Sequence, residues 1–225
     1  MRLFVIPMAA ALALSLVTPA ASAIAAPVPS AKKVDCKKAK CVALTMDDGP
    51  VAGTAQVLDT LKKYDVPATF FVVGKNAAAR PKLLARMVRE GHEVGSHSWD
   101  HAQLTKLSRA AMLKNLKRAD KAIRKGTGKR VKLLRPPYGS NDANVKSVEK
   151  SMGYRQVLWT VDPLDWKYRN TKTVVRNVLK ATRRNSIILT HDIHATTRAA
   201  YPKIIKSLKK KGYTFVTVSQ LLRTR

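Results

Sequence analysis

The sequence VALTMDDGP, residues 42–50, ends a β-branched and apolar run with two adjacent carboxylates and a Gly-Pro turn. Side chains alternate along a strand, so neighbouring carboxylates point to opposite sides unless the strand is ending. Here the strand ends, and Asp47 and Asp48 can both bend toward one cleft. Two carboxylates in one site repel each other unless a cation or a proton relieves them. The stretch therefore predicts a metal or a shifted pKa. The alternative is a surface turn, because Asp, Gly and Pro all favour turns.

Around this stretch, from Cys41 onward, short apolar runs rich in Val, Ile, Thr and aromatic residues alternate with stretches of helical period. Such alternation is typical of repeated strand-helix units and indicates an α/β fold with parallel strands. It predicts seven strands, at residues 42–47, 68–73, 93–97, 132–135, 154–161, 186–191 and 213–218. It predicts helices at residues 54–64, 81–90, 108–125, 142–152, 172–183 and 202–211. A chain of 225 residues is long enough for one undivided domain of this kind.

Proline and glycine mark the expected helix ends. Pro81 and Pro202 suit a first helical turn, where a missing N–H costs nothing. Four glycines follow expected helices at positions where a left-handed residue is needed: Gly91, Gly126, Gly153 and Gly212.

Reactive side chains concentrate at one end of the predicted strands. The residues that end or follow a strand are Asp47, Asp48, His97, Arg135, Asp162, Asp165 and His191. In a barrel of parallel strands the carboxyl ends form one face, where the strand-to-helix loops build the active site. Scattered structural residues would not sort in this way, so the pattern predicts an active site at this face.

His97 and His101 are four residues apart, a spacing that puts both imidazoles on one side of a helical turn. Together with one carboxylate from the first strand they would form a His-His-Asp set with open positions. That set suits catalytic Zn²⁺, and the same ligands also serve non-haem Fe(II). Two histidines at this spacing also arise by chance. His92 precedes a strand and is expected to be structural.

The loop RPPYG, residues 135–139, is stiffened by two prolines. Arg135 can hold a carboxylate by a forked pair of hydrogen bonds. The backbone amide of Tyr138 remains a free N–H that could serve an oxyanion. The alternative interpretation is a stiff surface turn.

A histidine oriented by a carboxylate is the arrangement that a general acid needs near neutral pH. His191 directly ends the sixth strand, whereas His194 lies farther into the loop, so His191 is the preferred candidate for the general acid. Either histidine could instead be structural. Trp159 lies inside the fifth strand and is expected in the core. Trp166 lies past its end and could face a ligand.

The N-terminal segment reads as an export signal over residues 1–26, because Arg2, an apolar run and small residues at a cleavage site follow in order. A membrane anchor is the competing interpretation, but the apolar run is shorter than the roughly 20 residues that span a bilayer. Residues 27–40 form a polar, lysine-rich arm, and residues 41–225 form the domain. The mature protein is therefore expected to be secreted, extracellular or wall-associated, without stable membrane insertion.

The close cysteine pair, Cys36 and Cys41, is expected to form a disulfide in an exported protein, and an incomplete metal site is the alternative. The formal net charge is +29, which attracts polyanions. For an exported protein an anionic cell wall is the expected counter-surface, and a merely soluble basic surface is the other interpretation. Nucleic acid is disfavoured because aromatic residues are only 6% and do not interleave with basic ones.

Five ordered blocks carry a family resemblance: TMDDGP, HSWDH, RPPYG, DPLDW and LTHD. In order and approximate spacing they resemble the polysaccharide deacetylases of the NodB-homology type, carbohydrate esterase family 4, over about residues 41–222. The resemblance implies a distorted, incomplete (β/α) barrel with about seven parallel strands. One departure is Met46, where the family more often has an aromatic residue, which bears on packing beneath the site more than on chemistry.

Carried over to this sequence, the resemblance implies a role for each of nine residues. The divalent metal, usually Zn²⁺, would be bound by Asp48, His97 and His101. Asp47 would be the general base held by Arg135, His191 the general acid oriented by Asp165, and Trp166 and Leu189 would wall the acetyl pocket.

The resemblance implies hydrolytic deacetylation of an N-acetylated polysaccharide. The basic charge favours N-acetylglucosamine units of peptidoglycan on an anionic wall, and residues 191–197 look like the wall-acting branch of the family. Chitooligosaccharide and then acetylxylan are the alternative substrates. A non-catalytic protein that coats wall polymer or nucleic acid is the alternative of another class, and the intact set of site residues argues against it.

Overall fold

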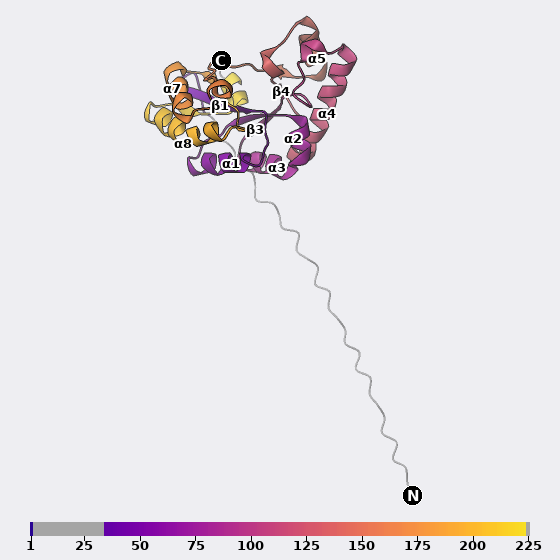
Figure 1. The fold of residues 1–225 in the computed structure, drawn as a ribbon, viewed down its shortest axis with the longest axis horizontal. Helices are drawn as coiled ribbons and strands as arrows, with labels where there is room; N and C mark the ends of the chain where they lie inside the picture. The colour runs from indigo at the N-terminus through magenta and orange to yellow at the C-terminus, as the bar shows by residue number, and fades with distance from the viewer. Residues whose placement is uncertain (2–33, 224–225) are drawn as a thin grey trace.

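The computed structural model describes residue 1 and residues 34–223, so the expected export signal and the first part of the arm lie outside the described residues. Seven parallel strands form one curved sheet, with helices packed around it (Figure 1). The strands are β1 (Cys41–Asp47), β2 (Thr69–Val72), β3 (Glu93–Ser96), β4 (Leu133–Leu134), β5 (Arg155–Gln156), β6 (Ser186–Ile188) and β7 (Thr214–Phe215). The expected α/β class and strand number are confirmed.

Strand β1 is the centre of the sheet. It pairs with β2 through its carboxyl half, with β7 through its first two residues, and with β6 on its other edge. The full order is β5-β4-β3-β2-β1-β6, with β7 attached to β1. All ladders are parallel, so their carboxyl ends lie at one edge of the sheet.

The barrel is not closed by a continuous ladder. The segment after β5 reaches β6 through a single bridge between Val161 and Ile188. The fifth strand was expected over residues 154–161, but β5 covers only Arg155–Gln156. The residues after β5 instead turn to meet β6, so one apolar run spans the gap without forming a long strand. The result is the incomplete barrel that the resemblance implied.

The helices link successive strands and cover the outside of the sheet. They are α1 (Thr54–Lys63), α2 (Gly74–Ala79), α3 (Pro81–Arg89), α4 (Arg109–Thr127), α5 (Ala143–Met152), α6 (Asp165–Tyr168), α7 (Thr171–Ala181), α8 (Ala195–Lys210) and α9 (Val218–Arg223). Two 3₁₀ turns, η1 (Leu104–Lys106) and η2 (Pro137–Gly139), lie in connections. Packed pairs include α2 and α3 against α4, and α7 against α8.

The six expected helices are present, but several ends differ. Helix α8 begins at Ala195, so Pro202 lies inside it and does not open it. Helix α4 runs on to Thr127 and is ended by left-handed Gly128, not by Gly126. Gly126 is instead a packing site, because an added Cβ would lie 2.8 Å from Leu84. The short helices α2, α6 and α9 were not expected.

Two apolar clusters occupy the two faces of β1. Val42, Leu44 and Met46 belong to the cluster between the sheet and the helices. Cys41 and Ala43 alternate with them and belong to the cluster on the inner face of the sheet. Met46 is only 1% exposed, so the residue that departs from the family pattern is fully packed. Thr45 and Asp47 continue the same face of β1 as Cys41 and Ala43. Their polar side chains therefore lie at the carboxyl end of the inner cluster.

Cys36 and Cys41 form the expected disulfide, and both are buried. The disulfide ties the segment before β1 to the inner cluster, and Arg184 donates a hydrogen bond to the Cys36 carbonyl. No helix in the described part of the chain is long and apolar enough to cross a membrane.

Candidate active site

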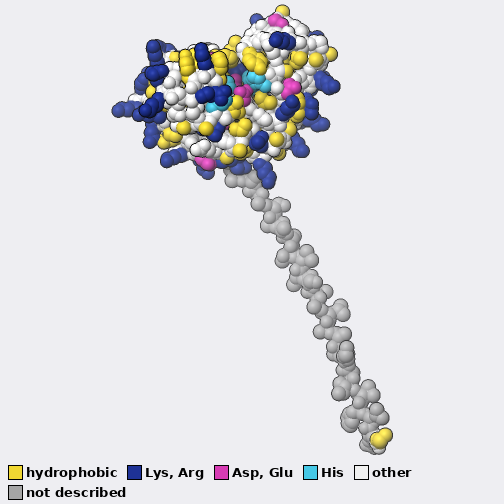
Figure 2. Space-filling view, viewed as in Figure 1, with side chains coloured by type: hydrophobic (Ala, Val, Ile, Leu, Met, Phe, Trp, Pro, Cys, Tyr) yellow, Lys and Arg dark blue, Asp and Glu magenta, His cyan; other side chains and the backbone are white. Residues whose placement is uncertain are grey.

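The carboxyl ends of four strands bring the reactive side chains together. Asp47 ends β1, and His97, Arg135 and His191 come after β3, β4 and β6 within three residues. A backbone bridge between Asp47 and His191 joins two of these ends directly. Figure 2 shows histidine and acidic side chains gathered in a hollow near the middle of the domain, with hydrophobic side chains around it and many lysines and arginines toward the periphery.

Asp48, His97 and His101 offer ligand atoms that all lie within 4.8 Å of one another. The Oδ1 atom of Asp48 lies 3.6 Å from Nε2 of His97 and 3.3 Å from Nε2 of His101. This Oδ1 atom is buried and has no hydrogen-bond partner among the described residues. A buried carboxylate oxygen without a donor is costly unless a cation or proton satisfies it. The arrangement therefore fits a divalent cation held between one carboxylate and two imidazoles.

The outer nitrogens of both imidazoles are also engaged. Nδ1 of His97 lies 2.6 Å from the Arg135 carbonyl, and Nδ1 of His101 lies 3.2 Å from the Tyr138 hydroxyl. A proton donated from Nδ1 leaves Nε2 unprotonated and free to face a metal. Burial also lowers the pKa of His97 to about 3, so this imidazole is neutral at physiological pH. Both observations suit metal ligands.

The spacing predicted that the two histidines meet on a helical turn, and this prediction is wrong. Residues 97–101 form turns in a loop, with Ser98 at φ 64° and His101 at φ 62°. Asp48 is also left-handed, at φ 73°, directly after β1. The approach of the three side chains to one another therefore depends on left-handed residues in the turns past the strand ends.

Asp47 lies beside the trio and is 2% exposed. Its Oδ1 accepts a hydrogen bond of 2.7 Å from Arg135, and its Oδ2 lies 3.8 Å from Nε2 of His97. Burial raises the pKa of Asp47, although the charge of Arg135 opposes that shift. A carboxylate with a raised pKa next to a metal site has the character of a general base.

Arg135 does not form the expected fork on a carboxylate. One guanidinium nitrogen donates both to Asp47 and to the hydroxyl of Thr45, 2.8 Å away. The other nitrogens donate to the carbonyls of Val157 and Leu158. The guanidinium also lies 4.1 Å from the ring centre of Phe71 and is fully buried. Its position is therefore fixed by the end of β1 and by the segment after β5.

Asp165 and His191 form a second pair, in which Asp165 is fully buried and His191 is partly exposed. Nδ1 of His191 lies 2.8 Å from Oδ1 of Asp165, whose Oδ2 accepts from the backbone N–H of His191 and from Thr197. Burial alone would lower the pKa of His191, but the hydrogen bond and charge of Asp165 raise it to about 9. Conversely, burial would raise the pKa of Asp165, and its bonds to His191 lower it. The imidazole is held as a cation, which is the form of a general acid.

The other residues singled out in the sequence lie around or outside the site. Trp166, in α6, is 47% exposed, and Leu189, which comes directly after β6, is 3% exposed. The His194 ring centre lies 6.1 Å from that of His191, but its Nδ1 atom lies 3.0 Å from an Arg169 nitrogen. Asp162 accepts a bond from the Leu164 amide and serves its own turn. His92 is buried and accepts from the Ala68 amide, as expected of a structural residue.

Several supporting residues escaped sequence reasoning. Thr45 bridges Arg135 and the Ile188 carbonyl, and Asn76 donates to the Asp48 carbonyl at 2.7 Å. Thr197 holds Asp165. Asp192 packs against Gly49, where an added Cβ would lie 2.7 Å from its carboxylate. Thr45 could have been found, because it is two residues before Asp47 and so shares its face of β1.

A scan against known families matches residues 34–157 to the model described as "Polysaccharide deacetylase". This chain belongs to the polysaccharide deacetylase family. The family assignment agrees with the resemblance carried by the five sequence blocks and with the open seven-stranded sheet.

Among the relatives of this deacetylase-family chain is the peptidoglycan-N-acetylglucosamine deacetylase PgdA of Listeria monocytogenes, 44% identical over 86% of this chain and 42% of the relative. The peptidoglycan-N-acetylmuramic acid deacetylase PdaC of Bacillus subtilis is 46% identical over 86% of this chain and 41% of the relative. The chain thus spans about two fifths of the length of these two proteins. The solved structure "T48 deacetylase with substrate" has a TM-score of 0.82 and 45% identity, covering 84% of this chain and 94% of that one.

Proposed function

We propose that this chain is an exported, metal-dependent hydrolase that removes acetyl groups from N-acetylglucosamine units of peptidoglycan. The observation that carries the proposal is the buried, unpartnered Oδ1 of Asp48 facing two imidazole Nε2 atoms. Two titratable groups lie beside that site: Asp47, whose pKa is raised by burial, and His191, whose pKa is raised by Asp165. The names of the two relatives support peptidoglycan as the substrate.

Zn²⁺ is the metal that we propose for Asp48, His97 and His101, because two imidazoles and one carboxylate are a common catalytic zinc set. When bound, the ion would supply a Lewis acid that lowers the pKa of water and polarises the acetamide carbonyl. The outer hydrogen bonds of the two imidazoles would keep Nε2 of each turned toward the ion.

The other residues would move protons and stabilise charge. Asp47 would accept the proton of the attacking water, and Arg135 would hold the Asp47 carboxylate in place. The backbone N–H of Tyr138 would donate to the oxyanion that forms on the acetamide. His191, kept cationic by Asp165, would donate its proton to the leaving sugar nitrogen. Water and the amide are thereby converted to acetate and a free amine, without a covalent enzyme intermediate.

Substrate choice rests on the rim of the site and on the relatives. We propose that Trp166 and Leu189 wall the acetyl pocket, since one is exposed at the rim and the other is buried after β6. N-acetylmuramic acid is a specific second candidate, because the relative PdaC carries that sugar in its name. Chitooligosaccharides and acetylxylan come next, in that order.

The decisive experiment is acetate release by the chain from residue 27 onward, with its metal content measured. We expect release from peptidoglycan to stop with a chelator and return with Zn²⁺. Parallel assays on chitooligosaccharides, acetylxylan and peptidoglycan with only one sugar acetylated would rank the substrates. Peptidoglycan that stays fully acetylated in the presence of zinc-loaded protein would contradict the proposed substrate. No release from any of these polymers would favour a non-catalytic wall-binding protein.

A further inference from the structure

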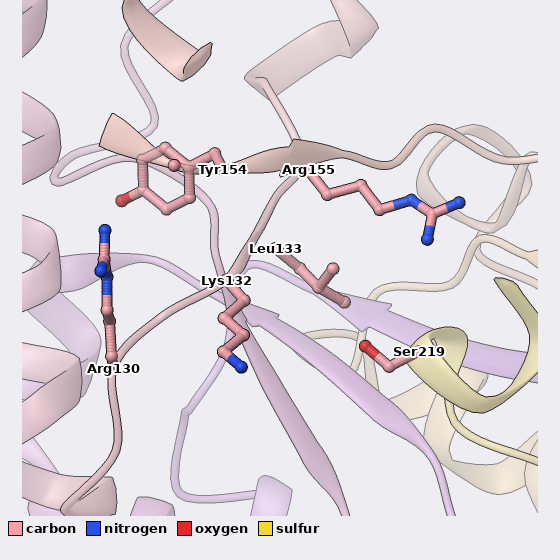
Figure 3. A pocket seen from close by; sticks show the side chains of 7 residues that line it. Arg130, Lys132, Leu133, Tyr154, Arg155 and Ser219 are labelled. Carbon is pink, nitrogen blue, oxygen red and sulfur yellow. The ribbon is translucent and has the colours of Figure 1, made fainter. Parts of the chain in front are cut away.

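Two adjoining pockets lie at the amino-terminal ends of β4 and β5, the opposite end of the sheet from the candidate active site. The first has a volume of about 450 Å³ and the second about 730 Å³. They share Arg130, Lys132, Leu133 and Ser219 among their lining residues. Figure 3 shows the first pocket, with side chains from the segment before β4, from the start of β5 and from α9 around it.

The charged side chains of the lining are mostly basic. The cations of the two pockets are Lys129, Arg130, Lys132, Arg155 and Arg223, and the one lining carboxylate among the described residues is Glu93. Glu93 is already engaged, because it accepts bonds from Thr69 and from the backbone and hydroxyl of Ser219. The positive charge of the lining is therefore not balanced from within the pockets.

Three of these cations are placed by the backbone around the first pocket. The Arg155 amide donates to the Lys132 carbonyl, so the parallel strands β4 and β5 hold these two residues beside each other. Arg130 lies against Gly153 and donates to the Met152 carbonyl at 3.2 Å. Across the described residues no carboxylate oxygen comes within 4.0 Å of these three cationic groups. The nearby Asp120 accepts instead from the Tyr154 hydroxyl.

We propose that this pocket binds the phosphodiester groups of an anionic wall polymer. Two guanidinium groups offer forked donors that match phosphate oxygens, and the lysine adds a point charge. The net charge of +29 would increase the local concentration of such a polymer. Because the pocket and the candidate active site lie at opposite ends of the strands, a polymer bound here leaves the other end free to meet glycan.

The pocket does not suit nucleic acid bases. Base-binding surfaces combine cations with exposed aromatic rings on which bases stack. Tyr154 is the aromatic residue that lines the first pocket, and it is only 9% exposed with its hydroxyl bonded to Asp120. The exposed large aromatic residues of the described chain, Tyr138, Trp166 and Tyr168, all lie beyond the carboxyl ends of strands. Phosphate recognition without base stacking is therefore the better fit.

The test compares two triple variants of equal charge change. The pocket variant is Arg130→Gln, Lys132→Gln and Arg155→Gln. The control is Lys203→Gln, Lys206→Gln and Lys210→Gln, three lysines of α8 that are exposed and line neither pocket. The probe is soluble poly(glycerol phosphate), with polyglutamate and duplex DNA as competing polyanions. Affinity is measured at fixed ionic strength, because salt screens all such contacts.

We expect the pocket variant to bind poly(glycerol phosphate) about tenfold or more weakly and the control to lose about twofold or less. If the triple variant fails to fold, Arg155→Gln alone replaces it. The Arg155 side chain makes no hydrogen bond to the described residues, so this single change should leave the fold intact and still weaken binding. If both triple variants lost the same affinity for poly(glycerol phosphate), the overall positive charge of the protein, and not this pocket, would account for binding. If polyglutamate binding depended on the pocket more strongly than poly(glycerol phosphate) binding does, the phosphodiester assignment would be overturned. If duplex DNA binding, which also presents phosphodiesters, depended on the pocket more strongly, the assignment to a wall polymer would be overturned in favour of nucleic acid.

Catalysis provides an independent readout. Acetate release from a short, uncharged N-acetylglucosamine oligomer should be the same in the wild-type protein and the pocket variant, since the pocket lies away from the reacting groups. Failure of all proteins to release acetate from both this oligomer and peptidoglycan would contradict the proposed function, and the polymer-binding result would still stand or fall by itself.

Discussion

Asp47 is a carboxylate that the fold buries between a guanidinium and an imidazole. The single bond to Arg135 and the 3.8 Å separation from His97 give it two neighbours with different consequences. Arg135 favours its charged form, whereas burial favours its neutral form and raises its pKa overall. Asp48 differs from it by one residue and by a left-handed turn, which directs its oxygen at both imidazoles. Neighbouring residues are thereby suited to different roles.

That separation of roles predicts different losses for two substitutions. Asp47→Asn keeps the shape and leaves Asp48 with both imidazoles, so we expect nearly normal metal content and a turnover lower by about 10²–10⁴-fold. His97→Ala removes a ligand, so both metal content and turnover should fall. Metal analysis and initial rates of acetate release on the same preparations check this. An Asp47→Asn protein with near-normal rates would remove the base from the scheme.

The Asp165–His191 pair predicts the alkaline side of the pH profile. A general acid must be protonated, and the pKa of His191 near 9 keeps it so at neutral pH, so kcat/KM should fall as pH rises through about 9. As the proposed base, Asp47 must be ionised, and its pKa is raised by burial, so the acidic limb should lie above the ordinary value of 3.8. Asp165→Asn removes the charge that raises the pKa of His191, so the alkaline limb should move to lower pH. A limb that stays in place in the pH profile of this variant would argue against His191 as the acid.

At the scale of elements, the site depends on the turns and loops at the carboxyl ends of the strands. The turn after β1 packs on the loop after β6, where Asp192 accepts a bond from Thr54 and has its Oδ1 buried against Gly49. Asn76, in α2, fixes the same turn from the other side through the Asp48 carbonyl. The residues that set the direction of Asp48 thus come from three separate connections.

This packing predicts that Gly49 tolerates no side chain. Gly49→Ala would put a Cβ 2.7 Å from the Asp192 carboxylate, so we expect a loss of roughly 1–3 kcal/mol in unfolding free energy and weaker metal binding. Asp192→Ala opens that space, so the double variant should be more stable than the sum of the two single changes allows. Denaturant unfolding and metal titration of all four proteins measure the coupling. Strictly additive effects would show that the two residues do not constrain each other.

At the scale of the whole molecule, the parallel sheet separates two chemistries. The carboxyl ends of the strands carry the trio that could hold a metal, the buried Asp47–Arg135 pair and the Asp165–His191 pair, and the amino-terminal ends of β4 and β5 carry the unbalanced cations. Such a division requires all strands to run the same way, as they do. The polymer-binding prediction belongs to this scale, because the proposed phosphodiester site and the candidate active site lie at opposite ends of the strands and can be occupied together.

The sequence by itself determined the α/β class, the seven strands and the disulfide partners, and it predicted which polar side chains gather at the carboxyl ends of the strands. It could do so because strand ends, apolar periodicity and reactive residue types are local features. Only the tertiary structure decided how His97 and His101 meet, how Arg135 distributes its donors, and that Thr45, Asn76, Thr197 and Asp192 support the site. These features depend on left-handed turns and on contacts between residues distant in the chain, and no local pattern specifies which distant groups will pack together.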